Sequence, residues 1–197
     1  MIQLIRPKFP PSKFSSSDPQ QDETNEEPGF ARSDRGRVVV FIDGASLFYA
    51  AMQLDIEIDY TRLLRFLVQG GRLIHAFFYT GVDPTNERQK GFLHWMQCNG
   101  YRVVTKELAQ ATNGSRRVNL NVEIAVDMVR LTEYCDTMIV VSGDGDLTSA
   151  VDFVTYRGVQ TEVVGLRSMI SDSLINVADY YVDLATLKQD IQKGQRS

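Results

Sequence analysis

Two aspartates follow an apolar run in the stretch MIVVSGDGDLTSA. Asp144 and Asp146 are separated by a single glycine, directly after a segment that is typical of a buried strand. Two carboxylates about 5 Å apart, at an effective dielectric of about 20, repel each other by roughly 3 kcal/mol. A metal ion, a shared proton, a basic partner or water would each offset this repulsion, and each implies a different chemistry.

A third acid, Asp43, ends another apolar run, RVVVFID. If the two strands are neighbours, three carboxylates converge at the carboxyl edge of the sheet, where open α/β sheets bind their ligands. Clustered oxygen ligands suit Mg²⁺ or Mn²⁺, which activate water for displacement at phosphorus. Two simpler interpretations stay open, because Gly and Asp favour turns and Asp43 could cap a following helix.

A second enzyme class also fits these residues. The Asp-x-Asp-x-Thr sequence within IVVSGDGDLT resembles the nucleophile motif of haloacid-dehalogenase-type phosphatases, in which the first Asp attacks phosphorus and the second is the acid. That motif usually opens its fold, whereas here it comes late in the chain. The sequence contains no G-x-G-x-x-G, P-loop or Gly-x-Ser-x-Gly motif, which argues against dinucleotide binding, P-loop NTP binding and an α/β-hydrolase.

The elements that must position these acids alternate between strand and helix patterns. This alternation predicts an α/β fold, a doubly wound, largely parallel sheet with helices on both faces. Asp59 is a predicted helix N-cap, Asn121 could cap a later helix, and 109–117 is expected to be a polar loop. Strands are predicted at 37–43, 72–81, 101–108, 137–143 and 159–166, with an edge strand at 180–184 and a terminal helix at 185–193. The aromatic side chains expected in the core are Phe48, Tyr49, Phe77, Phe78 and Trp95.

Composition separates a tail from a domain. The 197 residues carry a net charge of −4 with a pI of about 5.2, which argues against a strongly basic nucleic-acid coat protein. Residues 1–36 hold five of the six prolines and a polar, acidic stretch, so we expect a disordered tail before a domain at 37–193. No apolar run reaches the ~20 residues of a membrane span, and we expect a cytoplasmic protein without a membrane partner.

Three motifs in order resemble a known family. FIDGASLFYAA, NLNVEIAVDM and IVVSGDGDL are similar to the NYN domain, a branch of the PIN-like ribonuclease superfamily. Within that branch the resemblance is closest to the LabA-type proteins of cyanobacteria, and it covers residues 37–193. It implies a PIN-like doubly wound fold, an acidic pocket for Mg²⁺ or Mn²⁺, and hydrolysis of RNA by metal-activated water. It also implies, for the LabA-type branch, repression of transcription at the output of the circadian clock.

The resemblance assigns roles to individual residues. Asp43, Asp144 and Asp146 would be metal ligands and catalytic acids, and Asp127 matches a further family acid. Asp127 could equally be a helix-surface residue paired with Arg130. Arg116 and Arg117 lie where the family often has lysine and would contact a phosphate backbone, unless they belong to a solvated loop.

Two positions depart from the family pattern. Ser46 stands where the family has Asn, and Asn121 stands where it usually has Asp. Asn121 keeps a carbonyl ligand but removes one negative charge, which weakens a site for a hard divalent ion. Two hypotheses follow: a regulator acting through protein partners on a nuclease scaffold, or an active Mg²⁺/Mn²⁺-dependent endoribonuclease. The sequence leaves the RNA substrate, the partner and the oligomeric state open.

Overall fold

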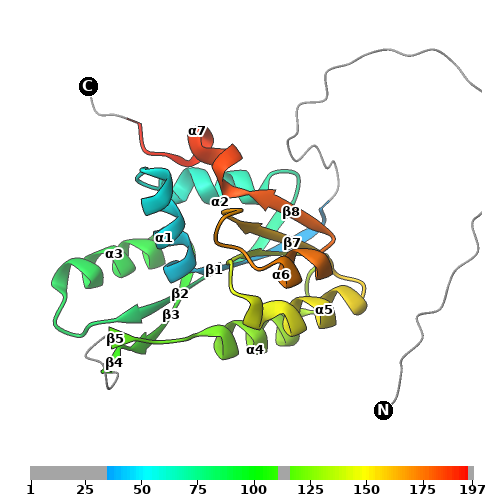
Figure 1. Cartoon of the computed structure of the whole chain (residues 1–197), viewed down its shortest axis with the longest axis horizontal. Helices are drawn as coiled ribbons and strands as arrows, with labels where there is room; N and C mark the ends of the chain where they lie inside the picture. Colours follow the sequence, from blue (N-terminus) through cyan, green and yellow to red (C-terminus); the bar gives the residue numbers. More distant parts are fainter. Residues whose placement is uncertain (1–34, 111–115, 195–197) are drawn as a thin grey trace, which may run out of the picture.

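The computed structural model of the chain describes residues 35–110 and 116–194. A sheet of six parallel strands runs through its centre in the order β3-β2-β1-β6-β7-β8 (Figure 1). This confirms the α/β fold with a doubly wound, parallel sheet. The strands are β1 (Arg37–Asp43), β2 (Arg72–Val82), β3 (Tyr101–Glu107), β6 (Thr137–Val141), β7 (Gln160–Gly165) and β8 (Tyr180–Asp183).

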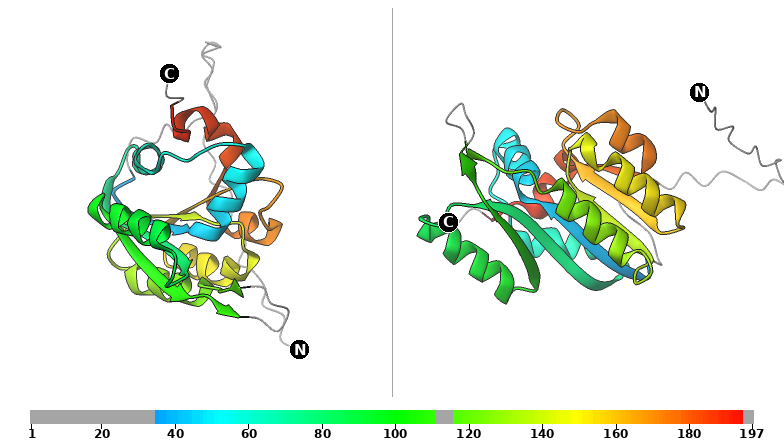
Figure 2. Two further views of the ribbon diagram at one scale, coloured as in Figure 1. Left: turned by 90° about the vertical axis from the view of Figure 1, so that its left-hand side faces the viewer. Right: turned by 90° about the horizontal axis from the view of Figure 1, so that it is seen from below.

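Helices cover both faces of the sheet, as the two turned views show (Figure 2). The helices are α1 (Gly44–Leu54), α2 (Tyr60–Val68), α3 (Glu87–Cys98), α4 (Asn121–Leu131), α5 (Thr148–Tyr156), α6 (Asp172–Val177) and α7 (Lys188–Ile191). Short 3₁₀ turns occupy Gly145–Leu147 and Leu184–Leu187. No helix within the described ranges is long and apolar enough to cross a membrane.

Strand β1 divides the hydrophobic core in two. Val38, Val40 and Ile42 pack on the side of α1, α2, α3 and α7, whereas Val39 and Phe41 pack on the side of α4, α5 and α6. All five side chains are fully buried. A strand buried on both faces needs a continuous apolar run, and the sequence RVVVFID supplies it.

The order of the strands creates a switch point between β1 and β6. From β1 the chain winds outward through β2 to β3, then crosses back to β6 on the other side of β1. Ligand sites of doubly wound sheets lie at the carboxyl ends of the two strands where the winding reverses. Asp43 ends β1 at this point, and Ser142 to Asp146 follow the end of β6.

Of the local predictions, the structure confirms the cap of α2 and contradicts the loop and the terminal helix. Asp59 caps α2 as expected, because its Oδ1 accepts the backbone N–H groups of Thr61 and Arg62 at 3.0 Å. The expected loop at 109–117 is wrong at its two ends, which pair as antiparallel strands β4 (Ala109–Gln110) and β5 (Arg116–Arg117). The terminal helix is shorter than predicted, since a 3₁₀ turn precedes α7.

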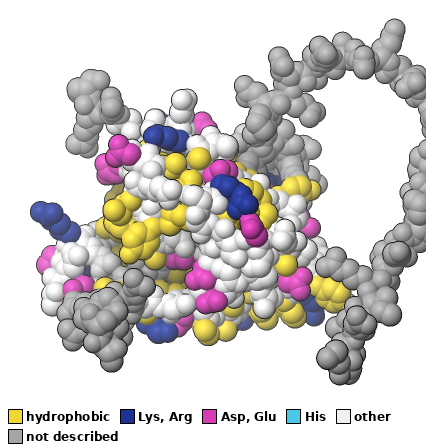
Figure 3. All heavy atoms as spheres, viewed as in Figure 1, with side chains coloured by type: hydrophobic (Ala, Val, Ile, Leu, Met, Phe, Trp, Pro, Cys, Tyr) yellow, Lys and Arg dark blue, Asp and Glu magenta, His cyan; other side chains and the backbone are white. Residues whose placement is uncertain are grey.

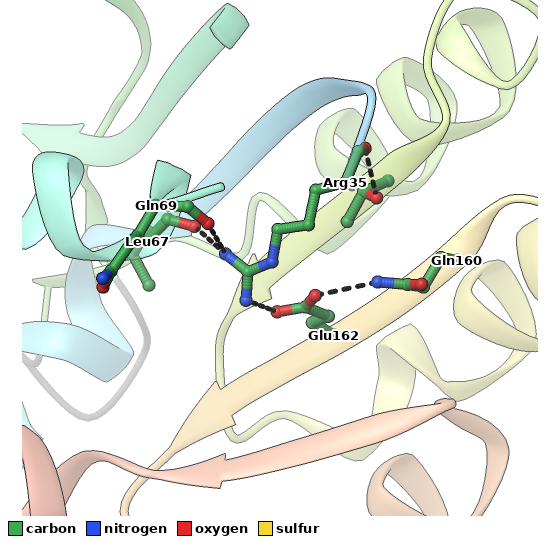
Figure 4. A network of polar contacts seen from close by, with 6 residues as sticks. Arg35, Leu67, Gln69, Gln160 and Glu162 are labelled. Carbon is green, nitrogen blue, oxygen red and sulfur yellow. Dashed lines mark hydrogen bonds and ion pairs between the residues drawn. The ribbon is translucent and has the colours of Figure 1, made fainter. Parts of the chain in front are cut away.

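The domain begins earlier than predicted, because Arg35 and Gly36 belong to it. Arg35 is 1% exposed and forms an ion pair with the fully buried Glu162 on β7 at 2.7 Å (Figure 4). The Arg35 guanidinium also donates to the carbonyl oxygens of Leu67 and Gln69 at the end of α2. The remainder of the predicted tail, residues 1–34, lies outside the described residues.

We predict that Arg35→Ala lowers the free energy of unfolding by about 3–5 kcal/mol, because Glu162 would then stay buried without its opposite charge. Urea denaturation measures the loss. Arg167→Ala is the control, since it removes an exposed ion pair with Asp172 and should cost about 1 kcal/mol or less. Equal losses in the two variants would show that the buried pair does not anchor the first strand.

Candidate functional site at the carboxyl ends of β1 and β6

Asp43 caps helix α1. Its Oδ1 accepts the backbone N–H groups of Ala45 at 3.0 Å and Ser46 at 3.3 Å. Its Oδ2 accepts the hydroxyls of Ser46 at 2.5 Å and Ser142 at 3.2 Å. The capping interpretation of Asp43 is therefore correct, and both carboxylate oxygens are hydrogen-bonded within the protein. Ser46 takes part in this network directly.

Ser142 joins the two strand ends, and sequence reasoning missed it. It is 1% exposed at the end of β6. Its hydroxyl lies 3.2 Å from Asp43 Oδ2 and 3.4 Å from Ser46 Oγ, and it accepts the backbone N–H of Asp144 at 3.2 Å. The one available signal was its place between the apolar strand and GDGD, where a buried hydroxyl must find partners.

Asp144 is held from two sides. Its Oδ1 accepts the backbone N–H of Asp146 at 2.9 Å, and its Oδ2 accepts the side-chain Nδ2–H of Asn121 at 2.7 Å. Because a carboxylate only accepts hydrogen bonds, the amide must present its NH₂ group to Asp144. Asn121, which is 9% exposed, thus does not cap α4; the side chain of Asn119 accepts the Asn121 N–H instead.

Close packing fixes the glycines beside the two acids. A Cβ on Gly143 would lie 2.6 Å from the carbonyl oxygen of Met169, and one on Gly44 would lie 2.8 Å from that of Tyr79. Neither backbone oxygen can move away cheaply. Gly44 of the IDG motif and Gly143 of the SGDG motif are therefore required, because neighbouring backbone approaches them closely at the switch point.

The structure does not bring Asp146 and Asp127 into the cleft beside Asp43 and Asp144. Asp146 is exposed. Asp127 accepts the hydroxyl of Tyr79 at 2.9 Å and pairs with Arg130 at 3.2 Å. Burial, and secondarily the nearby Asp127, raises the pKa of Tyr79, which keeps its hydroxyl protonated as the donor. Asp127 follows the alternative interpretation, that of a residue paired with Arg130.

A cleft of about 680 Å³ contains both central acids. Asp43, Asp144, Ser46 and Asn121 lie on its wall together with two aromatic residues of α1. Phe48 and Tyr49 are 57% and 58% exposed and make an edge-to-face pair at 5.6 Å.

The expected core position is wrong for three of the five aromatic residues, because Phe48, Tyr49 and Trp95 are exposed, whereas Phe77 and Phe78 are buried. The alternation of apolar residues along α1 did not distinguish its buried Leu47 from its exposed neighbours.

Arg116 and Arg117 form strand β5, whose backbone pairs with β4. The next residue, Val118, lines the cleft. The chain therefore passes from the two arginines directly into the cleft wall and on to Asn121.

The described residues do not fit the expected Mg²⁺ or Mn²⁺ site. Within 35–110 and 116–194, no group of three or more His, Cys, Asp or Glu side chains is arranged to hold a metal ion. The oxygens of Asp43 and Asp144 are already hydrogen-bonded, and Asn121 directs N–H donors at Asp144. A hard divalent ion needs oxygen ligands, and an N–H donor repels it. Neutral donors surround the paired acids.

The fold and this pair of strand-end acids define an NYN-type α/β domain. The chain belongs to the NYN domain family, whose pattern matches residues 37–185. It is 34% identical over 169 residues to the low amplitude and bright protein LabA of Synechococcus elongatus, a match that covers 81% of this chain and 90% of that protein. The predicted resemblance to LabA-type proteins is confirmed.

Two other similarities carry less information, one because its sequence identity is low and the other because it covers a short segment. A crystal structure of a protein of unknown function from Vibrio parahaemolyticus superposes with a TM-score of 0.70 at 22% identity, covering 83% of this chain and all of that one. This likeness supports the fold. NAD kinase of Shewanella oneidensis is 36% identical over 66 residues, which is 34% of this chain and 20% of the kinase. That match is local.

We predict that Asn121→Asp destabilises the domain at pH 7 by about 3 kcal/mol, the repulsion of two charges about 5 Å apart at an effective dielectric of about 20. The pair must then share a raised carboxyl pKa in the folded state, so acidification to pH 5 should recover part of the lost stability. Melting temperatures at pH 5 and pH 7 measure this.

Asn119→Asp is the matched control, because it makes the same chemical change at an exposed position and keeps the oxygen that accepts the Asn121 N–H. An Asn121→Asp variant as stable as Asn119→Asp at pH 7 would contradict the direct contact between position 121 and Asp144.

Proposed function

We propose that this chain is a regulatory NYN-domain protein that binds single-stranded RNA in the cleft without cleaving it efficiently. One observation carries the proposal: Asn121 donates a hydrogen bond to Asp144 at 2.7 Å, in the place where the family pattern has an acid. This contact occupies one oxygen of Asp144 with a neutral donor, and we infer that the cleft serves as a binding surface. The resemblance to LabA supports a role in gene expression at the output of a circadian clock, exercised in the cytoplasm and through protein partners.

The aromatic residues of the cleft support RNA as the ligand. Phe48 and Tyr49 expose their rings beside the acids, and successive bases of a single strand stack on such rings with little regard to sequence. Arg116 and Arg117 precede the cleft wall and offer positive charge for the backbone. The overall charge of −4 implies that stacking, more than long-range attraction, holds the strand.

We predict that Phe48→Ala/Tyr49→Ala weakens binding of a labelled single-stranded RNA about tenfold or more, since each stacked base contributes roughly 1–3 kcal/mol. Fluorescence anisotropy measures the affinity. Met52→Ala is the matched control, because Met52 is an exposed apolar residue on the same helix that does not line this cleft. Equal affinities of the double variant and the native chain would remove the aromatic pair from the binding surface.

Cleavage of the same RNA in Mn²⁺ tests the second half of the proposal. The native chain should leave the RNA intact, as should Asp43→Asn/Asp144→Asn. Asn121→Asp restores a third carboxylate and should gain both Mn²⁺-dependent thermal stabilisation and cleavage. Cleavage by the native chain that disappears in the double variant would instead establish an active metal-dependent endoribonuclease.

A further inference from the structure

A second groove lies beside the cleft, between α1, the start of α2 and α3. It has a volume of about 660 Å³, and Phe48, Met52 and Trp95 are 57%, 62% and 41% exposed along it. Tyr60 and Phe92 also line it, and they pack together with ring centroids 5.2 Å apart. Figure 3 shows apolar side chains, in yellow, gathered over α1 and towards α3. We call this surface the aromatic groove.

The charges of the aromatic groove favour a peptide over a nucleic acid as its occupant. Its lining includes Glu57 and Asp59, and the ammonium group of Lys193 already pairs with Glu57. A phosphate backbone would therefore meet two carboxylates and a cation that is already engaged. Grooves with aromatic walls instead bind proline-rich peptide segments, which are extended before they bind and lose little entropy on binding.

Residues 1–14 of the same chain have the composition that such a groove binds. The stretch MIQLIRPKFPPSKF contains Pro7 and Pro10 at the P-x-x-P spacing, together with six large apolar residues, three basic residues and no acid. Residues 15–34 differ sharply, because they contain six acids and a single large apolar residue, Phe30. An apolar, proline-rich stretch next to a polar, acidic one is typical of a docking segment that a linker joins to its domain.

The linker is long enough to bring residues 1–14 to the aromatic groove. The backbone N–H of Arg35 donates to the carbonyl oxygen of Gly70 at 3.1 Å, which fixes the start of the domain at the end of α2. Tyr60 and Thr61, at the start of the same helix, line the groove. The nine residues of α2 span about 14 Å, whereas the 20 residues between the segment and Arg35 have an r.m.s. end-to-end distance of about 25 Å. A linker that matches its span in this way gives an effective concentration in the millimolar range.

We propose that residues 1–14 dock in the aromatic groove of their own chain, with residues 7–11 packed against Trp95. At a millimolar effective concentration, a contact with a dissociation constant of about 100 µM is occupied about nine-tenths of the time. A separate protein would have to exceed that concentration or bind more tightly, so the tethered segment is the favoured occupant. The proposal does not depend on RNA binding, because Trp95 does not line the cleft.

Tryptophan fluorescence of the full chain tests the proposal, because Trp95 is the one tryptophan of the sequence. Phe9→Ser/Pro10→Ser should raise the acrylamide quenching constant of Trp95 at least twofold, since the docked segment no longer shields the ring. Pro28→Ser/Phe30→Ser is the matched control, because it changes the same residue types within the linker, and it should be quenched like the native chain. Equal quenching of Trp95 in the native chain and in Phe9→Ser/Pro10→Ser would overturn the proposal. Shielding that disappears on dilution would assign the segment to a neighbouring copy and would overturn docking within one chain.

Limited digestion with trypsin tests the same contact from the side of the segment. Docking should slow cleavage after Lys13, so Trp95→Ala should speed this cleavage several-fold while the melting temperature stays unchanged. Tyr180→Ala is the control, because Tyr180 is an aromatic residue of nearly equal exposure that does not line the aromatic groove. A Trp95→Ala variant that is cleaved after Lys13 at the native rate would exclude docking of residues 1–14 against Trp95.

Discussion

The structure depends on the complete burial of β1. Its two neighbours, β2 and β6, pair with it along both edges, and its side chains fill the core on both faces. Because β1 is the first strand in the described chain and still has a neighbour on each side, the winding of the chain must reverse beside it. The reversal places the end of β1 next to the end of β6. The proximity of Asp43 and Ser142 follows from this topology, so no further structural feature is needed to bring the two residues together.

Charged side chains lie at both ends of this arrangement, fully buried at one end and partly buried at the other. At the amino ends of the strands, Arg35 and Glu162 neutralise each other directly, and the Nη1 group of Arg35 donates to the backbone carbonyls of Leu67 and Gln69. At the carboxyl ends, the carboxylates of Asp43 and Asp144 face one cleft. Hydroxyls, backbone N–H groups and one amide surround them. The first end is closed, whereas the second lines an open cleft.

The elements of the fold could be predicted because their signals are local. Apolar runs marked all six strands of the sheet, and Asp43 and Asp59 were recognisable as helix caps from their own neighbourhoods. The contacts that the sequence concealed join distant residues. Arg35 meets Glu162 across 127 positions, and Ser142 meets Asp43 across 99. The polar composition of residues 1–36 led us to place Arg35 in a tail, because no neighbouring residue indicates that Arg35 has a buried partner.

The sequence predicted where the candidate site lies, but not which side chains line it. The strand-end rule placed Asp43 and Asp144 correctly, because topology alone determines the ends of parallel strands. The rule does not say which side chains turn inward, and Asp146 and Asp127 lie outside the cleft for reasons of local geometry: a 3₁₀ turn in one case and the Tyr79 hydroxyl in the other. The exposure of Phe48 and Tyr49 on α1 could not be predicted either, because helical spacing separates two faces of a helix without showing which one is buried.

Two acids can persist at such a site without a metal ion, because each has a structural role. Asp43 caps α1, and Asp144 caps the 3₁₀ turn Gly145–Leu147 while fixing Asn121 at the start of α4. Both carboxylates therefore accept backbone N–H groups that would otherwise lack partners at the starts of these elements. The presence of the pair is therefore no sign of catalysis on its own. Under the proposed function, an acid at position 121 would distinguish a nuclease from a binding protein on this scaffold, and here Asn121 donates a hydrogen bond to Asp144 instead.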